Sequence, residues 1–203
     1  MNLREWVYYD GRELLFKKCR WMGFPAWKNP LDAWIYQEIV HDTKPDVIIE
    51  IGSMEGGSTL YFAHLLDLLG HGEVVSIDID RSRFHVKHER ILAITGSSSS
   101  PEVITKVFEL CQGKSAMVVQ DGAHDKASVL SDLRSYCKLV PVNGYFIVED
   151  GVADLLWPVD WYGNGPLAAV EQFLTENPDF VADAEKERYL LTYNPRGFLK
   201  RIR

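Results

Sequence analysis

The stretch DVIIEIGSMEGGS, residues 46–58, decides the fold, because it joins a short apolar run to a helical pattern through a glycine-rich turn. The run Asp46–Ile51 is rich in Val and Ile, as expected of a strand that is covered on both faces of a sheet. From Ser58 to Leu69 the apolar residues recur at helical spacing. The stretch therefore predicts the first strand, turn and helix of a parallel sheet.

The same alternation of strand and helix patterns continues along the chain. Short Val- and Ile-rich runs predict further strands at Glu73–Ile77, Ile91–Ile94, Ala116–Gln120 and Tyr145–Val148. Helical spacing predicts helices at Pro101–Cys111, Lys126–Leu139 and Leu167–Thr175. This order implies right-handed crossovers and a Rossmann-like α/β fold with a doubly wound, mostly parallel sheet.

The two ends of the chain differ from this pattern. Arg188–Tyr193 and Phe198–Ile202 flank a turn at residues 194–197, which predicts an antiparallel hairpin that completes the sheet. The first 45 residues contain four tryptophans, which indicates packing or, alternatively, a lid or a subunit contact. We therefore expect an N-terminal helical and aromatic segment over residues 1–45 and a cofactor-binding domain over residues 46–203. A mobile loop is expected at Gly151–Pro166, beside the site.

Composition limits the possible functions. The chain has 203 residues, 46% of them hydrophobic, which suits one domain with one core. No apolar run reaches the ~18 residues that span a membrane, and Arg4, Glu5 and Asp10 interrupt the pattern of a signal peptide, so a cytoplasmic location is expected. The net charge of −7 argues against nucleic acid as a partner and favours a small-molecule substrate. The three cysteines have neither disulfide nor zinc-site spacing.

The glycine-rich turn distinguishes between cofactors by its spacing. Ser58 stands where a P-loop requires lysine, which argues against a nucleoside triphosphate. Met54 stands where a dinucleotide-binding turn requires its middle glycine, which disfavours NAD. Glu50, the acid that opens the turn, indicates a cofactor with positive charge. S-adenosylmethionine carries a sulfonium and an ammonium group, and its carboxylate could meet backbone N–H groups at the helix start.

Further residues are expected to complete this cofactor site. Asp78, which follows the second predicted strand, is placed to accept hydrogen bonds from ribose hydroxyls, with Asp80 as the alternative. The polar stretch after the third strand either contacts the adenine or only caps the next helix. The candidate cofactor-binding residues are Glu50, Gly52, Ser53, Gly56, Gly57, Ser58, Asp78, Asp80, Gly96, Ser97, Ser98 and Asp121.

Three carboxylates follow the last two parallel strands. Asp121 comes after the fourth strand, and Glu149 and Asp150 come after the fifth. Because parallel strands end at the same edge of a sheet, these carboxylates are expected to converge beside the cofactor. Their mutual repulsion is best neutralised by a cation, and oxygen ligands favour Mg²⁺, with Mn²⁺ or Ca²⁺ as alternatives. Asp121, Glu149 and Asp150 are therefore the predicted metal ligands.

The same edge of the sheet carries the candidate catalytic residues, Asp121 and His124. A metal-bound hydroxyl has a lowered pKa and a fixed orientation, both of which favour attack on a methyl donor. His124 is a candidate general base, because the pKa of an imidazole lies near neutral pH. Asp125 either orients His124 or caps the helix that follows.

Together these motifs resemble the cephalosporin hydroxylase and rhamnosyl O-methyltransferase family of class I methyltransferases. The resemblance begins near Trp21 and covers nearly all of the chain that follows. The similar stretches are Trp21–Gly23, Pro30–Asp32, Tyr36–Glu38, Lys44–Asp46, the glycine-rich turn, Val74–Asp78, Thr95–Ser98, Asp121–His124, Val148–Asp150, Gly163–Pro166, Glu176–Phe180 and Leu191–Pro195.

The resemblance implies a seven-stranded methyltransferase fold, S-adenosylmethionine as donor, and Mg²⁺ held by Asp121, Glu149 and Asp150. It also implies O-methylation of hydroxyls on sugars or antibiotics, as in secondary metabolism, and a homo-oligomer. The stretch Asp121–His124 departs from the family's frequent Asp-Ser-Asp-His by lacking one carboxylate, and Gly151 replaces a common threonine. An NAD-dependent oxidoreductase and a non-catalytic binding protein for S-adenosylmethionine are the alternatives.

Overall fold

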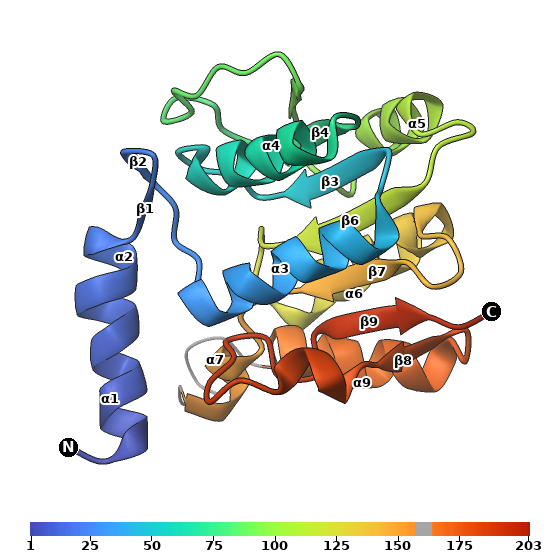
Figure 1. Cartoon of the computed structure of the whole chain (residues 1–203). Helices are drawn as coiled ribbons and strands as arrows, with labels where there is room; N and C mark the ends of the chain where they lie inside the picture. Colours follow the sequence, from blue (N-terminus) through green and yellow to red (C-terminus); the bar gives the residue numbers. More distant parts are fainter. Residues whose placement is uncertain (157–163) are drawn as a thin grey trace.

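The computed structural model, which describes residues 1–156 and 164–203, contains a seven-stranded sheet in the order β5-β4-β3-β6-β7-β9-β8 (Figure 1). The strands of this sheet are β3 (Val47–Ile51), β4 (Glu73–Asp78), β5 (Ile91–Thr95), β6 (Ala116–Gln120), β7 (Tyr145–Val148), β8 (Phe180–Ala182) and β9 (Phe198–Arg201). Strands β5, β4, β3, β6 and β7 are parallel, whereas β9 and β8 run antiparallel. The predicted strands at the centre of the sheet are thus confirmed.

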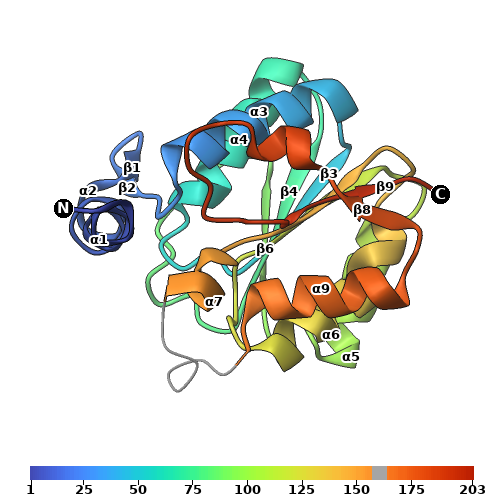
Figure 2. The ribbon, with the colours of Figure 1, turned by 90° about the horizontal axis from the view of Figure 1, so that it is seen from below.

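Helices cover both faces of the sheet (Figure 2). One face carries α3 (Pro30–Thr43) and α4 (Gly57–Leu69), and the other carries α5 (Pro101–Leu110), α6 (Lys126–Tyr136) and α9 (Pro166–Glu176). Alternate strand residues point to opposite faces, so Ile48 and Val119 pack with α3 and α4, while Ile49 and Val118 pack with α6 and α9. The predicted doubly wound, Rossmann-like α/β fold is confirmed.

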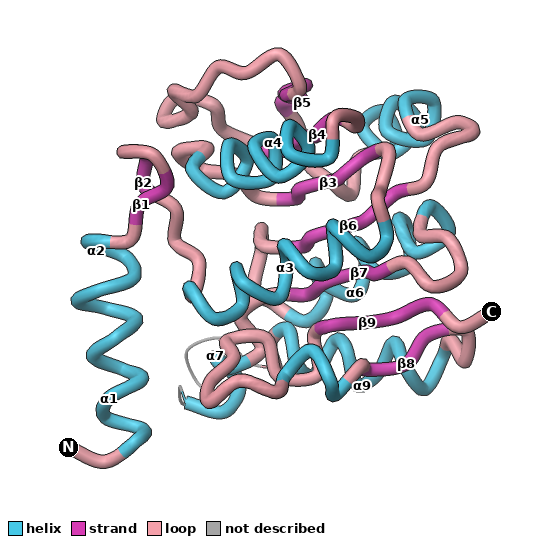
Figure 3. Tube along the Cα trace, viewed as in Figure 1, coloured by secondary structure: helices cyan, strands magenta, loops and turns pink. Residues whose placement is uncertain are grey.

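The N-terminal segment stands beside the sheet (Figure 3). It comprises α1 (Leu3–Tyr9), the π-helical η1 (Asp10–Leu15), α2 (Phe16–Lys18) and a small hairpin of β1 (Arg20–Trp21) and β2 (Phe24–Pro25). Val7 and Leu15 attach it to the core by packing against Val152 and Tyr193. The domain boundary after residue 45 stays a prediction, although α3, which precedes it, packs directly on the sheet.

The C-terminal hairpin is present, but its predicted first strand, Arg188–Tyr193, was wrong. The strand that pairs with β9 is β8, which is followed by the 3-10 helix η3 (Ala184–Glu187). The segment Arg188–Tyr193 is held by the side chain of Asp32 instead. The Asp32 carboxylate accepts hydrogen bonds from the Tyr193 N–H at 2.8 Å and from the Thr192 hydroxyl at 2.6 Å. With its polar groups bonded to α3, this segment does not join the sheet.

Two further predicted elements differ in extent. The helix predicted to reach Leu139 ends at Tyr136 and continues as the 3-10 turn η2 (Cys137–Leu139), just before Pro141. The loop predicted at Gly151–Pro166 includes the short helix α7 (Val152–Leu156), and residues 157–163 lie outside the described residues. None of the described helices has the length and apolar character needed to cross a membrane.

Candidate active site

A cavity of about 670 Å³ opens where the parallel strands end. Its walls come from the turns after β3, β4, β5 and β6 and from one face of α6. Ile51 pairs with Ile77 on one side and with Gln120 on the other, so the three central strands end level with one another. Ligands of doubly wound sheets bind at this edge.

Gly52 brings the turns after β3 and β6 into contact. Its φ is +85°, and a Cβ at this position would lie 2.2 Å from the Asp121 carbonyl oxygen. Gly56 and Gly57 were predicted to face the cofactor, but they do not line the cavity. Their lack of a side chain instead allows other parts of the chain to pack closely against them. A Cβ on Gly57, for example, would lie 1.9 Å from the Pro25 carbonyl oxygen.

Glu50 lies behind the glycine-rich turn and not in the cavity wall. The side chain is fully buried and accepts a hydrogen bond from the Thr59 hydroxyl, and burial raises its pKa. Its second oxygen, Oε1, has no hydrogen-bond partner among the described residues. A direct contact of Glu50 with a positively charged cofactor therefore stays a prediction.

Asp78 lines the cavity, whereas Asp80 is exposed outside it. The Asp78 carboxylate accepts the Ser53 and Met54 N–H groups, both at 2.9 Å, and the Asp80 N–H at 3.1 Å. Burial opposes ionisation, but these backbone hydrogen bonds lower the pKa of Asp78. Asp80 itself caps a turn by accepting the Ser82 N–H at 2.8 Å. Asp78 is thus the ionised acceptor at this side of the cavity.

Serine side chains from two turns form much of the remaining wall. The predicted residues that line the cavity here are Ser53, Ser58, Gly96, Ser97 and Ser98. Arg81, which no sequence motif indicated, connects these turns. Its guanidinium donates to the Ser53 hydroxyl at 2.6 Å and to the Ile94 carbonyl at 2.9 Å.

Lys28 is the unexpected member of the site. Its Nζ lies 2.5 Å from Asp121 Oδ2 and 2.6 Å from Glu149 Oε1, and the residue is only 5% exposed. Burial alone would lower the pKa of this ammonium group, but the charges of Asp121, Glu149 and Glu50 raise it, so Lys28 is protonated. An internal cation therefore already pairs with two of the three predicted metal ligands, Asp121 and Glu149.

The third predicted ligand, Asp150, faces His124. His124 Nε2 lies 2.9 Å from Asp150 Oδ2 and 3.9 Å from Asp121 Oδ1. Burial would lower the pKa of His124, but its hydrogen bond and charge interaction with Asp150 raise it. The ligand atoms of Asp121, His124 and Asp150 all lie within 4.8 Å of one another, a spacing that fits one divalent cation. Asp125 caps α6 through the Ser128 N–H, so of its two predicted roles the structure supports the cap.

Asp150 owes its orientation to an unusual backbone conformation. Its φ is +58°, in the left-handed region that non-glycine residues rarely adopt. The buried Asn194 holds it there, because Asn194 Oδ1 accepts the Asp150 N–H at 3.0 Å while Asn194 Nδ2 donates to the Tyr36 hydroxyl at 2.7 Å. Asn194 thereby connects Asp150 to α3.

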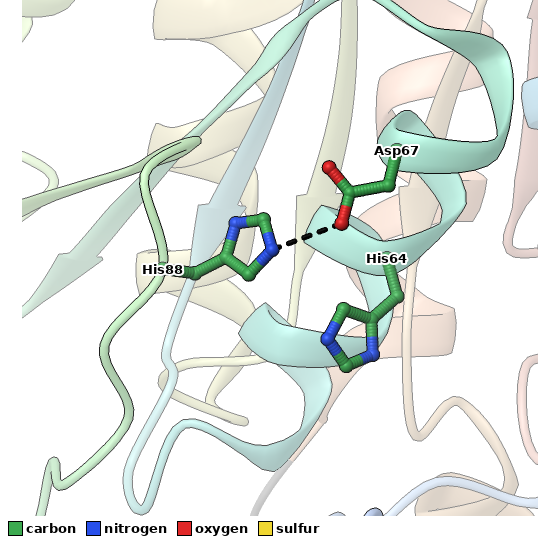
Figure 4. A group of neighbouring side chains, drawn as sticks. All are labelled: His64, Asp67 and His88. Carbon is green, nitrogen blue, oxygen red and sulfur yellow. Dashed lines mark hydrogen bonds and ion pairs between the residues drawn. The ribbon is translucent and has the colours of Figure 1, made fainter.

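A second group of metal-binding residue types, His64, Asp67 and His88, joins α4 to the segment before β5 (Figure 4). His64 Nδ1 accepts the Trp21 indole N–H at 3.0 Å, and His88 Nδ1 accepts the Arg90 N–H at 3.2 Å. Each neutral ring therefore carries its own proton on Nε2, where a metal would need a lone pair. His88 Nε2 instead lies 2.9 Å from Asp67 Oδ2, which makes this group a structural clamp.

Comparisons with known proteins identify the family of the chain. A family model described as Rhamnosyl O-methyltransferase/CmcI matches residues 14–202. A rhamnosyl O-methyltransferase from Mycobacterium tuberculosis (strain ATCC 25618 / H37Rv) is 30% identical over 206 residues, covering 97% of this chain and 82% of the relative. The rhamnosyl O-methyltransferase from Mycobacterium leprae (strain TN) is 29% identical over 205 residues, covering 97% and 88%.

Solved structures of methyltransferases share the fold. CmcI with Mg and SAM ("cmcI-D160 Mg-SAM") has a TM-score of 0.72 at 24% identity, covering 100% of this chain and 85% of that chain. MycE methyltransferase in complex with Mg, SAH and mycinamycin VI has a TM-score of 0.54 at 18% identity, covering 86% and 53%. The chain belongs to the rhamnosyl O-methyltransferase/CmcI family of S-adenosylmethionine-dependent O-methyltransferases.

Proposed function

We propose that this chain transfers the methyl group of S-adenosylmethionine to a hydroxyl of a sugar or of another secondary metabolite, with a divalent cation, Mg²⁺, beside that hydroxyl. One observation carries the proposal. Asp121, which converges with His124 and Asp150, lines the same cavity as Asp78. A nucleoside acceptor and a candidate cation site thus adjoin one pocket through Asp121, as methyl transfer to a coordinated oxygen requires.

The donor set suits the cation. Asp121 and Asp150 offer the hard oxygen ligands that Mg²⁺ prefers, and His124 offers a nitrogen. A divalent cation bound here would lower the pKa of a coordinated hydroxyl and fix its oxygen toward the methyl group. Glu149 remains the third predicted ligand, although its carboxylate is paired with Lys28 in this arrangement.

His124 is the proposed proton acceptor. Asp150 fixes its ring by the contact at Nε2, and the raised pKa of His124 makes it a stronger base. The same nitrogen cannot hold a metal and a proton at once, so metal ligation and general-base catalysis are alternative roles for His124. A His124→Ala variant that loses most of its rate at an unchanged Mg²⁺ requirement would favour the base, and a raised Mg²⁺ requirement would favour the ligand.

The N-terminal segment before α3 is proposed to contribute to the site on one side and to a contact between subunits on the other. Pro25, Trp27 and Lys28 line the cavity, which supports the predicted lid. On the outer side, α1 and its neighbours leave Leu3, Trp6, Tyr9 and Phe16 between 40% and 63% exposed. Exposed aromatic side chains on one segment are typical of subunit contacts, so we expect a homo-oligomer in solution.

Cofactor binding and metal dependence can be tested together. S-adenosylhomocysteine at about 100 times its Kd is expected to stabilise the protein by ~2.7 kcal/mol, which raises the Tm by roughly 5–10 °C, whereas NAD is expected to have no effect. Methyl transfer from labelled S-adenosylmethionine to a panel of rhamnosides and polyketide alcohols should disappear on chelation and return with Mg²⁺. Full activity after chelation would contradict the metal role, and stabilisation by NAD alone would contradict the cofactor.

Loss of the Asn194 support is expected to disturb the site from a distance. In an Asn194→Ala variant, nothing holds Asp150 in its left-handed conformation, so methyl transfer should fall by roughly 10–100-fold and the Mg²⁺ concentration for half-maximal rate should rise. Tyr36→Phe is a comparison variant, because it removes the other hydrogen bond of Asn194 and leaves the one to Asp150, although it also removes a hydroxyl that interacts with Glu149. A wild-type rate and a wild-type Mg²⁺ requirement in Asn194→Ala would show that Asn194 does not position Asp150.

A further inference from the structure

One face of α6 forms a wall of the cavity, and it carries an acid that the reaction does not use. Ser128, Ser131 and Asp132 line the cavity from this face, at the three- and four-residue spacing that places side chains together on a helix. Asp132 is only 2% exposed, so the rest of its surroundings are protein. The cavity is therefore the only open side that a ligand can use to reach this carboxylate within the part of the chain described here.

Asp132 is also incompletely bonded. Its Oδ1 has no hydrogen-bond partner among the described residues. Another buried acid of the fold, Asp32, accepts three hydrogen bonds, from Asn29, Thr192 and Tyr193. Buried carboxylate oxygens are normally satisfied in this way, because leaving water without a new donor is unfavourable. Because Asp132 lines the cavity, its unpaired oxygen indicates that a ligand supplies the donor.

The position of Asp132 identifies the part of the ligand that it would meet. One helical turn later, the Tyr136 hydroxyl donates to the Ser98 carbonyl at 2.6 Å, which fastens α6 to the turn after β5. In the sheet, β5 is separated from β6 by β4 and β3, so this turn is remote from Asp121. The proposed function puts the reacting methyl group near Asp121 and the ribose at Asp78. The base, at the other end of the cofactor, is then the part that lies toward the turn after β5 and Asp132.

We propose that the Asp132 carboxylate accepts a hydrogen bond from the 6-amino group of the cofactor's adenine and so selects adenine over other purines. This inference rests on the proposed function. In an adenine nucleoside the 6-amino group is the one hydrogen-bond donor of the base, and an ionised carboxylate only accepts. Burial raises the pKa of Asp132 to about 6, although hydrogen bonds from Ser98 and Gln120 partly offset this increase. Asp132 is therefore ionised at pH 8.

The test compares two ligands by calorimetry at pH 8 with the full chain. One is S-adenosylhomocysteine, and the other is its 6-deamino analogue, in which purine replaces adenine and the donor is missing. The wild type is expected to bind S-adenosylhomocysteine roughly 10–100-fold more tightly than the analogue, as for a hydrogen bond to a charged group. In Asp132→Ala this preference should fall below about threefold. Asp132→Asn, whose amide oxygen still accepts, should retain part of it.

Controls separate selection from general damage. Ser135→Ala removes a polar group from the same helix outside the cavity lining and is expected to keep the wild-type preference. Thermal melts without ligand should show both Asp132 variants folded. Asp132→Asn keeps the size of the side chain and an oxygen acceptor, and Asp132→Ala removes a buried carboxylate that has one unpaired oxygen. A preference that survives in Asp132→Ala would overturn this inference alone. Failure of the wild type to bind S-adenosylhomocysteine would overturn the proposed function and this inference with it.

Discussion

Replacing Asp121 with asparagine is expected to lower kcat/KM for methyl transfer by at least about 100-fold. Asp121 contacts both the buried lysine and the candidate cation site. Its Oδ2 pairs with Lys28, and its Oδ1 faces His124. An amide of the same shape neither neutralises Lys28 nor contributes charge to a cation site. Initial rates measured over a range of Mg²⁺ concentrations should show a lower maximum and a higher Mg²⁺ requirement.

Asp125→Asn is the matched control for this experiment. Asp125 belongs to the same segment, but its carboxylate caps α6 through the Ser128 N–H. Asparagine caps helices about as well as aspartate, so the Asp125→Asn variant should keep near-normal rates and stability. If Asp121→Asn also stays within threefold of the wild-type rate, the carboxylate of Asp121 has no part in the reaction.

Replacing Lys28 with methionine is expected to cost about 3–5 kcal/mol of folding stability, because it leaves the Asp121 and Glu149 carboxylates enclosed without their cation. For a chain of this size the Tm should fall by roughly 6–20 °C. Mg²⁺ should stabilise Lys28→Met more strongly than the wild type, since a divalent cation can replace the missing charge. Thermal melts with and without Mg²⁺ measure both effects.

Two further variants define what this result means. Adding Glu149→Gln to Lys28→Met removes one of the unpaired charges and should recover part of the lost stability. Lys17→Met, in the same N-terminal segment, breaks only the exposed pair with Glu13 and should change stability by less than about 1 kcal/mol. A Lys28→Met protein that melts like the wild type would show that the carboxylates do not depend on Lys28.

The central part of the fold could be predicted because its signals are local. A Val- and Ile-rich run such as Val47–Ile51 is buried on both faces, and the sequence pattern reflects this directly. Arg188–Tyr193 has a similar apolar character, yet it is held by Asp32, which precedes it by about 160 residues. An interaction between residues so far apart in sequence leaves no local pattern. The strand that pairs with β9 was therefore predicted at Arg188–Tyr193 and not at β8.

The candidate site was predictable in part for the same reason. Parallel strands end at one edge, so the convergence of Asp121, His124 and Asp150 follows from where each stands after its strand. Lys28 was missed because it precedes α3 and reaches Asp121 across 93 residues. A signal did exist, since acids buried together require a cation and Lys28 directly precedes the Asn29–Pro30 start of a helix. Asp132 and Asn194 had no such signal.

The salt bridge from Lys28 to Glu149 also orders events during synthesis. The two residues stand 121 positions apart, and Lys28 leaves the ribosome long before either of its partners. Until β6 and β7 have emerged and paired, the Lys28 ammonium group cannot form its salt bridges with Asp121 and Glu149. The N-terminal segment that carries Lys28 is then not yet attached to the pocket. The first part of the chain to be made is thus among the last to be fixed, and nascent chains halted before Glu149 should leave their N-termini open to protease.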